Sequence, residues 1–261
     1  MKAVAKQPLS MSFKLVTQPM FEFFSLVAKT LIAIWTPPYR IKDIFRQLEF
    51  VIWESAPVVI FSVSFAAIVT IIEASFHMKL VIKNDALVPG FAALLILREL
   101  GAVVSALLIT SRVGAGLAAE VGTMKVTEQI DALRMLGIQP IKYLVVPRFI
   151  ACVVGGLVLS VLANLVCLYC AMLVSQIKLG YSSGSFIMAM RSFVSFQDLV
   201  FAGIKGAAFG SVIPLFSCFY GFRCQSGADG VGSATTKSVV TTSVAIIVLD
   251  FILGYIFSYM Y

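Results

Sequence analysis

Charged residues are scarce in this 261-residue chain: lysine, arginine, aspartate and glutamate make up 13% of it, against 60% hydrophobic residues. This composition excludes an ordinary water-soluble domain and predicts an integral membrane protein. The length leaves no room for a separate soluble catalytic domain. The net charge of +7 does not indicate a nucleic-acid partner, because the positive residues flank apolar segments and form no binding stripe.

The sequence lacks the residues that several kinds of catalytic site require. His77 is the only histidine, which excludes a His-Glu-x-x-His zinc site and leaves few bases for a serine nucleophile. No Gly-Lys dipeptide occurs, so the Gly-x-x-x-x-Gly-Lys-Ser/Thr loop is absent and any ATP hydrolysis must belong to another subunit. Cys167 and Cys170 lie one helical turn apart, but no second pair completes a metal site. We expect no catalytic residue, no metal and no cofactor.

A secretory signal peptide is not expected at the amino terminus. Its apolar run is interrupted by Glu22 and Lys29, and no small-residue cleavage site follows. Apolar side chains instead recur at helical spacing, namely Phe21, Phe24, Ala28, Leu31 and Trp35. This pattern predicts an amphipathic helix over residues 20–35 that lies in the cytoplasmic interface and ends at Pro37-Pro38. A short transmembrane hairpin is the alternative.

Long apolar runs predict an all-α protein with five transmembrane helices, at about Glu54–Phe76, Leu87–Thr110, Val145–Ile177, Phe196–Phe219 and Val239–Tyr259. Most lysines and arginines lie before the first span and in the second and fourth connections. The other two loops hold only Lys79, Lys83, Lys178 and Arg191. The amino terminus is therefore expected in the cytoplasm. We divide the chain into an amino-terminal part, residues 1–47, and a five-helix domain, residues 48–261.

Four charges lie near the middle of these spans: Arg98, Glu99, Lys205 and Asp250. A lone charge near the bilayer centre costs at least about 2.5–3.5 kcal/mol, so such residues pair, face a wet cavity or handle a charged substrate. The four charges sum to zero, which favours pairing, and a lipid head group is a further possible partner. Glu99 points about 100° away from Arg98 on a helix, so the two should serve different neighbours. The open alternatives are a structural ion pair and a substrate cavity lined by Glu99 and Lys205.

Small residues and an acid accompany these charges on the fourth span. Gly203, Gly206 and Gly210 have the spacing that lets another helix approach closely, so we assign them to packing. Asp198 lies at the start of this span, where we expect it to cap the helix.

The segment 114–140 between the second and third spans is predicted to be a loop with one short helix, Thr127–Leu136. Thr127 is expected to cap that helix, Glu128 and Asp131 to lie in its first turns, and Gly137 to take the left-handed position that ends it. Such a charged, capped helix on the cytoplasmic side can dock a soluble partner. A merely solvated loop helix is the alternative.

Several motifs together resemble the MlaE family, the permease subunits of bacterial ABC transporters that move phospholipids between membranes. They are Arg98-Glu99-Leu100-Gly101, Arg112-Val113-Gly114-Ala115-Gly116, Ala119-Glu120-Val121-Gly122, Thr127-Glu128-Gln129-Ile130-Asp131-Ala132-Leu133 and Pro147-Arg148. Further matches lie at Lys205, Ala234-Thr235-Thr236 and Leu249-Asp250-Phe251, so the similarity covers about residues 50–260. The chain departs from the family pattern at Glu73, His77 and Ala102.

The resemblance implies a multi-pass protein of the bacterial inner membrane that forms a homodimer and binds phospholipid in a central cavity. It also implies two cytoplasmic ATPase subunits and a periplasmic MCE-domain protein as partners. The ATPase-coupling residues would be Glu120, Lys125, Glu128, Asp131 and Arg134, and the cavity residues Arg98, Glu99, Lys205 and Asp250. Two alternative functions remain open. One is a proton-coupled secondary transporter that uses Glu99 and Asp250 as proton carriers, and the other is a membrane scaffold that transports nothing.

Overall fold

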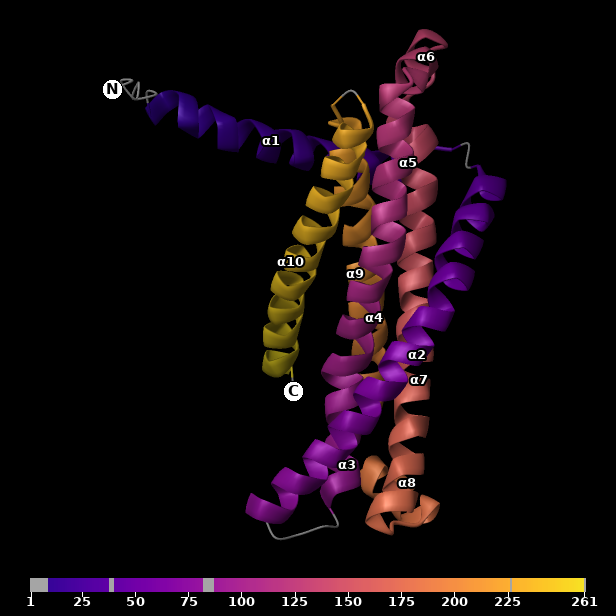
Figure 1. Ribbon diagram of the computed structural model, residues 1–261, viewed down its shortest axis with the longest axis vertical. Helices are drawn as coiled ribbons and strands as arrows, with labels where there is room; N and C mark the ends of the chain where they lie inside the picture. The colour runs from indigo at the N-terminus through magenta and orange to yellow at the C-terminus, as the bar shows by residue number, and fades with distance from the viewer. Residues whose placement is uncertain (1–8, 38–39, 82–86, 226, 261) are drawn as a thin grey trace.

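The computed structural model describes residues 9–37, 40–81, 87–225 and 227–260, and within these ranges the chain forms helices and short connections without a strand (Figure 1). Five helical segments are long and apolar enough to cross a membrane, at Ile41–Met78, Val88–Val126, Ile141–Leu179, Phe196–Phe222 and Ala228–Tyr259. The prediction of five spans is therefore confirmed, and all five helices run longer than the apolar windows that identified them.

The second span is one helical rod built from five pieces: α3 (Val88–Leu95), η2 (Ile96–Leu100), α4 (Gly101–Ile109), η3 (Thr110–Gly114) and α5 (Ala115–Val126). The predicted loop at 114–126 is therefore wrong, because a fall in hydropathy was taken for the end of the helix. Alanine and leucine keep helix propensity high there. Packing of α5 on α9 and α10 adds stability that a sequence window cannot detect.

The first span is α2 (Ile41–Val81), so residues 47 and 48, where we divided the chain, lie inside a single helix. The third span joins η4 (Ile141–Val145) to α7 (Val146–Leu179), and Pro147 occupies the first turn of α7 as expected. A short helix that the sequence analysis missed, α8 (Ser183–Phe193), follows. The Ser182 hydroxyl caps α8 by accepting a hydrogen bond from the Ser185 backbone at 3.1 Å. The last two spans are α9 (Phe196–Phe222) and α10 (Ala228–Met260).

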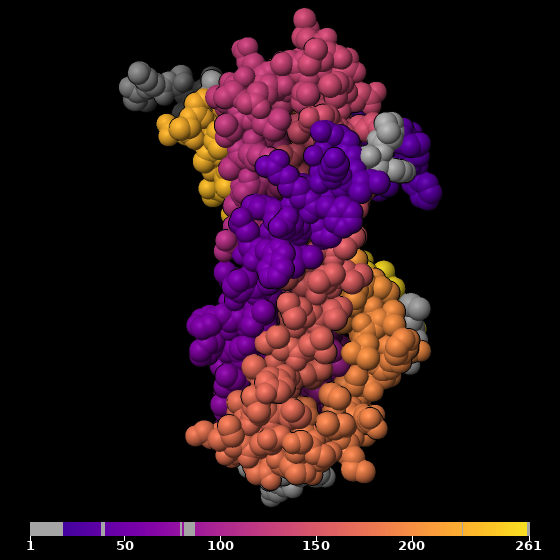
Figure 2. Space-filling view, turned by 90° about the vertical axis from the view of Figure 1, so that its right-hand side faces the viewer, coloured from indigo at the N-terminus to yellow at the C-terminus, as the bar shows by residue number. Residues whose placement is uncertain are grey.

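α7 is the central helix and packs against both α2 and α9. Figure 2 shows the face of the molecule on which α2 and α7 cross. On the other side of α7, a Cβ added at Gly156 would lie 2.7 Å from the Gly206 carbonyl oxygen and 2.9 Å from the Gly210 Cα, so glycine allows the two backbones to touch. The packing role predicted for Gly206 and Gly210 is thus confirmed. The one predicted for Gly203 is wrong, since nothing lies within 4 Å of its added Cβ.

α1 (Leu9–Ile34) lies across the bundle instead of along it (Figure 1). Its Phe23 ring stacks on Phe216 of α9 with 4.3 Å between ring centroids, and Leu26 packs with Leu215 and Phe219. The Glu22 carboxylate lies 3.5 Å from the Arg223 guanidinium at the end of α9. These contacts hold α1 at the end of the bundle where α9 finishes, in the orientation expected of an interfacial helix.

Candidate functional site

Lys205, in the middle of α9, is completely buried and joins three helices. Its Nζ atom lies 3.0 Å from the Glu99 carboxylate on η2 and 2.6 Å from the Asp250 carboxylate on α10. The pairing that charge balance favoured is therefore present for these three residues, which we call the lysine cluster. Glu99 is the exposed member, with 53% of its side chain accessible against 0% for Lys205.

The backbone of η2 supplies a further contact. Lys205 Nζ donates to the main-chain carbonyl oxygen of Arg98 at 2.8 Å, and it lies 5.1 Å from the centroid of the Phe201 ring. η2 is a π-helical segment, a widened turn that occurs often at functional sites. The ammonium thus donates to two oxygens, those of the Arg98 carbonyl and the Glu99 carboxylate, and it also lies within ion-pair distance of Asp250.

Arg98 does not join the lysine cluster. Its Nε atom donates to Asp198 Oδ1 at 2.8 Å, while the second oxygen of Asp198 accepts hydrogen bonds from the backbone and hydroxyl of Ser195 at 2.9 and 3.0 Å. The capping role expected of Asp198 is confirmed, and its pairing with Arg98 was missed. Neighbouring helix positions diverge by about 100°, so Arg98 and Glu99 have different partners, as predicted: Arg98 donates to Asp198, and Glu99 accepts from Lys205.

Beside these charges lies a cavity of about 320 Å³, lined by Arg98, Glu99, Phe201, Gly254, Phe257 and Ser258. Its walls therefore combine two opposite charges with aromatic rings, and the Arg98 guanidinium lies 5.3 Å from the centre of the Phe257 ring. Lys205 and Asp250 are not among the lining residues. The lysine cluster meets this cavity through Glu99, and such a site can hold a charged head group next to apolar chains.

The segment after the second span projects from the same end of the molecule as α1 (Figure 1). Its helix is α6 (Gln129–Met135), shorter than predicted. The cap assigned to Thr127 is wrong: its hydroxyl donates back to the Thr123 carbonyl at 2.8 Å, because α5 continues to that point. Glu128 precedes α6 in the left-handed region at φ 60°, without a side-chain cap. Gly137 is left-handed at φ 74°, as predicted.

Three of the five predicted coupling residues lie together, and Glu120 and Glu128 do not join them. Asp131 lies 2.8 Å from Lys125 Nζ and 2.9 Å from Arg134 Nη1, so these three residues brace α6 against α5. The hydrogen bond from Lys125, with the positive charges of Lys125 and Arg134, lowers the pKa of Asp131 from its ordinary value. Glu120 lies elsewhere and pairs with the buried Arg148 of α7 at 2.8 Å.

The tip of α6 carries exposed apolar side chains that the sequence analysis did not single out. Met135 is 90% exposed and Leu136 is 74% exposed, at the end of a helix that extends beyond the bundle (Figure 1). Exposed apolar residues on a rigid projection are typical of a surface that docks another protein.

A family model described as Permease MlaE matches residues 44–256. A probable ABC transporter permease protein of Rickettsia typhi is 34% identical over 89% of both chains. The intermembrane phospholipid transport system permease protein MlaE of Haemophilus influenzae is 40% identical over 62% of both chains. A chloroplastic protein of Arabidopsis thaliana named TRIGALACTOSYLDIACYLGLYCEROL 1 is 38% identical over 64% of this chain and 48% of its own.

Proposed function

This chain belongs to the MlaE permease family, and from that premise we propose that it is the membrane-spanning subunit of an ABC transporter that moves phospholipids between the bacterial inner and outer membranes. The Rickettsia and Haemophilus relatives are named as permeases, and this sequence contains no nucleotide-binding loop of its own. ATP hydrolysis is assigned to separate cytoplasmic subunits.

The observation that carries the proposal is the charged cavity beside the lysine cluster. A phospholipid needs charged groups near its head and apolar walls for its chains. Arg98 and Glu99 offer the head group one charge of each sign, and Phe201 and Phe257 offer apolar surface. Lys205 holds Glu99 and is itself held by Asp250, so we assign Lys205 and Asp250 to the binding site as positioning residues.

A second copy of the chain is proposed to close this cavity. Glu99 faces outward in a single chain, and α10 presents a mostly exposed apolar surface, including Val240, Val244, Ile247, Val248, Phe251 and Tyr255. A charged side chain on a face that meets hydrocarbon is unfavourable. A homodimer that joins these faces shields Glu99 and doubles the lining of the cavity.

α6 is proposed to receive the ATPase subunits, with Lys125, Asp131 and Arg134 holding its angle and Met135 and Leu136 in the contact. Glu120 and Glu128 belong to the same coupling region. This places α6, α1 and the amino terminus in the cytoplasm, as the distribution of lysine and arginine favours. The opposite end, which carries α8, would then face a periplasmic MCE-domain protein.

Co-purification followed by lipid mass spectrometry tests the function. We expect the chain to be isolated as a dimer with an ATPase subunit and bound phospholipid, and to move lipid only when ATP is hydrolysed. Transport by the purified chain alone under a proton gradient would establish the secondary-transporter alternative. Absence of bound phospholipid and of transport in any state would leave the scaffold alternative.

A further inference from the structure

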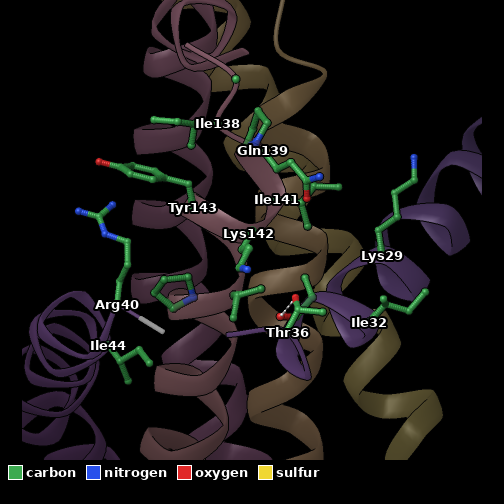
Figure 3. Close-up of a pocket in the computed structure, with 15 residues that line it drawn as sticks. Lys29, Ile32, Thr36, Arg40, Ile44, Ile138, Gln139, Ile141, Lys142 and Tyr143 are labelled. Atoms are coloured by element: carbon green, nitrogen blue, oxygen red, sulfur yellow. Dashed lines mark hydrogen bonds between the residues drawn. The ribbon is translucent and has the colours of Figure 1, made fainter. Parts of the chain in front are cut away.

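A second cavity lies at the end of the bundle that carries α6, and it shares no lining residue with the cavity beside the lysine cluster. Its volume is about 1050 Å³, slightly above the range of about 300–1,000 Å³ common for ligand sites. α1 forms one wall, the start of α2 forms another, and the segment Gly137–Pro147 forms the third. Figure 3 shows these three parts converging around Lys142. We call this space the α1 cavity.

The charges on the α1 cavity are all of one sign. Among the described residues that line it are Lys29, Arg40 and Lys142 and no aspartate or glutamate. Lys29 and Arg40 stand on opposite sides with Lys142 between them (Figure 3). A concave site with three cations has a positive potential that attracts an anion.

Two of these cations lack an acidic partner. Arg40 is neutralised by Asp43 at 2.7 Å and lies over the Tyr143 ring, 4.0 Å from its centroid. Lys142 donates to the carbonyl oxygen of Pro37 at 3.0 Å, a neutral acceptor that leaves its charge uncompensated. Among the residues that the structure describes, no carboxylate lies within ion-pair distance of Lys29 or Lys142.

The adjacent cavity provides a useful contrast. It has a volume of about 510 Å³ and shares Arg40, Tyr143 and Pro147 with the α1 cavity, but it also contains Asp43 and Glu120. Each of these acids pairs with an arginine, Asp43 with Arg40 and Glu120 with Arg148. Two of the three arginines that line this neighbouring cavity thus have an acidic partner, whereas no described acid pairs with Lys29 or Lys142 of the α1 cavity.

The remaining walls of the α1 cavity are largely apolar, formed by Ile32, Ala33, Ile44, Ile138, Ile141 and Val146. A small soluble anion such as phosphate has no apolar surface to bury against these walls. A phospholipid can contact both the cations and the apolar walls, with its phosphate near the lysines and an acyl chain along the isoleucines. Basic pockets between membrane helices commonly hold anionic lipid head groups.

We propose that the α1 cavity binds one anionic glycerophospholipid from the surrounding leaflet, with its phosphate between Lys29 and Lys142. The lipid is not the transported molecule: it fills the angle between α1 and the bundle and joins α1, α2 and the start of α7. The site is therefore selective for head groups with a net negative charge, and it remains occupied whether or not the transporter turns over.

The test uses the full chain in nanodiscs of phosphatidylcholine that contain a trace of photoactivatable phosphatidylglycerol or, in parallel, photoactivatable phosphatidylcholine. Crosslinked peptides are identified by mass spectrometry. We expect the phosphatidylglycerol probe to label the segments that contain Ile32 and Ile138 in preference to the phosphatidylcholine probe. Each lysine near a lipid surface contributes about 1 kcal/mol, so Lys29→Gln and Lys142→Gln should each reduce this labelling roughly fivefold and the double variant roughly 30-fold.

Lys42→Gln is the matched control. Lys42 is exposed on the first turn of α2 at the same end of the molecule, but it does not line the cavity, so labelling should remain unchanged. Thermal unfolding of each variant shows whether a loss of labelling reflects a loss of fold. If the single Lys29→Gln variant, which loses no described hydrogen bond, keeps its unfolding temperature and loses labelling, the site is supported.

Three results would overturn the proposal. Equal labelling by the two probes would show an unselective groove. Displacement of the phosphatidylglycerol probe by millimolar glycerol phosphate would show that a soluble phosphate compound is the ligand. Loss of labelling when the whole transporter is assembled in the same nanodiscs would show that a partner polypeptide occupies this space.

Discussion

The Lys205 ammonium on α9 donates a hydrogen bond to the main-chain carbonyl oxygen of Arg98 on η2 at 2.8 Å, so one cationic residue is anchored on the backbone of another. The two side chains then separate, Lys205 to Glu99 and Asp250, and Arg98 to Asp198. One short π-helical segment therefore serves two ion-pair systems, and the two can be tested independently.

The lysine cluster should tolerate removal of all its charges better than removal of one. Lys205→Met leaves Glu99 and Asp250 together without a cation, and breaking a buried pair costs about 3–5 kcal/mol, so the amount of folded protein in the membrane should fall sharply. Adding Glu99→Gln and Asp250→Asn to Lys205→Met should restore that amount while phospholipid transport stays low. Wild-type transport by the triple variant would leave the cluster with a structural role only.

Asp198 should contribute to the free energy of unfolding through its ion pair with Arg98 as well as through the helix cap. Loss of a hydrogen bond to a charged group costs about 1.5–3 kcal/mol, whereas loss of a helix cap costs about 0.5–2 kcal/mol. Asp198→Asn, which retains an oxygen for the cap, should therefore lower the unfolding free energy by at least as much as Ser195→Ala. A double-mutant cycle with Arg98→Met isolates the pair, and a coupling energy near zero would refute it.

Adding a single methyl group at the contact between α7 and α9 should destabilise the protein. A Cβ at Gly210 would overlap the carbonyl oxygen of Cys152, and overpacking costs about 1–3 kcal/mol, so Gly210→Ala should lower the thermal unfolding temperature. Gly203→Ala is the control on the same helix. It has open space around the new methyl and should be neutral or stabilising by up to about 1 kcal/mol, because alanine favours the helix.

The apolar tip of α6 should carry much of the ATPase contact. Met135→Asp together with Leu136→Asp replaces two exposed apolar side chains with charges, and the affinity for the ATPase subunit should fall at least about tenfold. Met188→Asp on α8 changes a similarly exposed methionine at the other end of the molecule and should leave that affinity unchanged. Equal pull-down of the ATPase by all three proteins would move the docking surface away from α6.

The contact of Asp131 with Lys125, which holds α6 against α5, should be lost only at low pH. Because Lys125 lowers the pKa of Asp131, the stabilisation that Asp131 gives is complete above its ordinary value of 3.8 and disappears as the pH falls through the lowered value. Hydrogen exchange of the α6 amides should therefore show constant protection from neutral pH down to that value once the intrinsic rates are corrected. Asp131→Asn should reduce protection at neutral pH. A transition in wild-type protection near neutral pH would contradict this account.

The five spans could be predicted because a membrane imposes a length and a hydropathy that a short window detects. The ends of the helices could not. Residues 114–126 lose hydropathy but keep helix-forming residues, and the contacts of α5 with α9 and α10 decide the outcome. α8 was missed because its polar amino-terminal residues gave no apolar window, although Ser182 is a recognisable capping residue.

The site, too, could be predicted only in part. Charge balance inside the apolar spans predicted that Lys205 would be paired, since an unpaired charge is costly there. Charge balance does not show which residues form each ion pair. Asp198 was assigned only to a local cap because it is far from Arg98 in the sequence. The α1 cavity could not have been predicted, because its three walls are brought together only by the crossing of α1 over the bundle.

The distribution of the lysine cluster over three helices also sets an order for biosynthesis. Glu99 leaves the ribosome first, Lys205 follows about a hundred residues later, and Asp250 comes last. Since membrane helices enter the bilayer largely one after another and then associate, Glu99 is already in place when the lysine arrives. An acidic partner for Lys205 is thus already in the membrane when α9 is inserted, and Lys205 can pair before α10 is made. Asp250 arrives with α10 and supplies the second acid of the cluster.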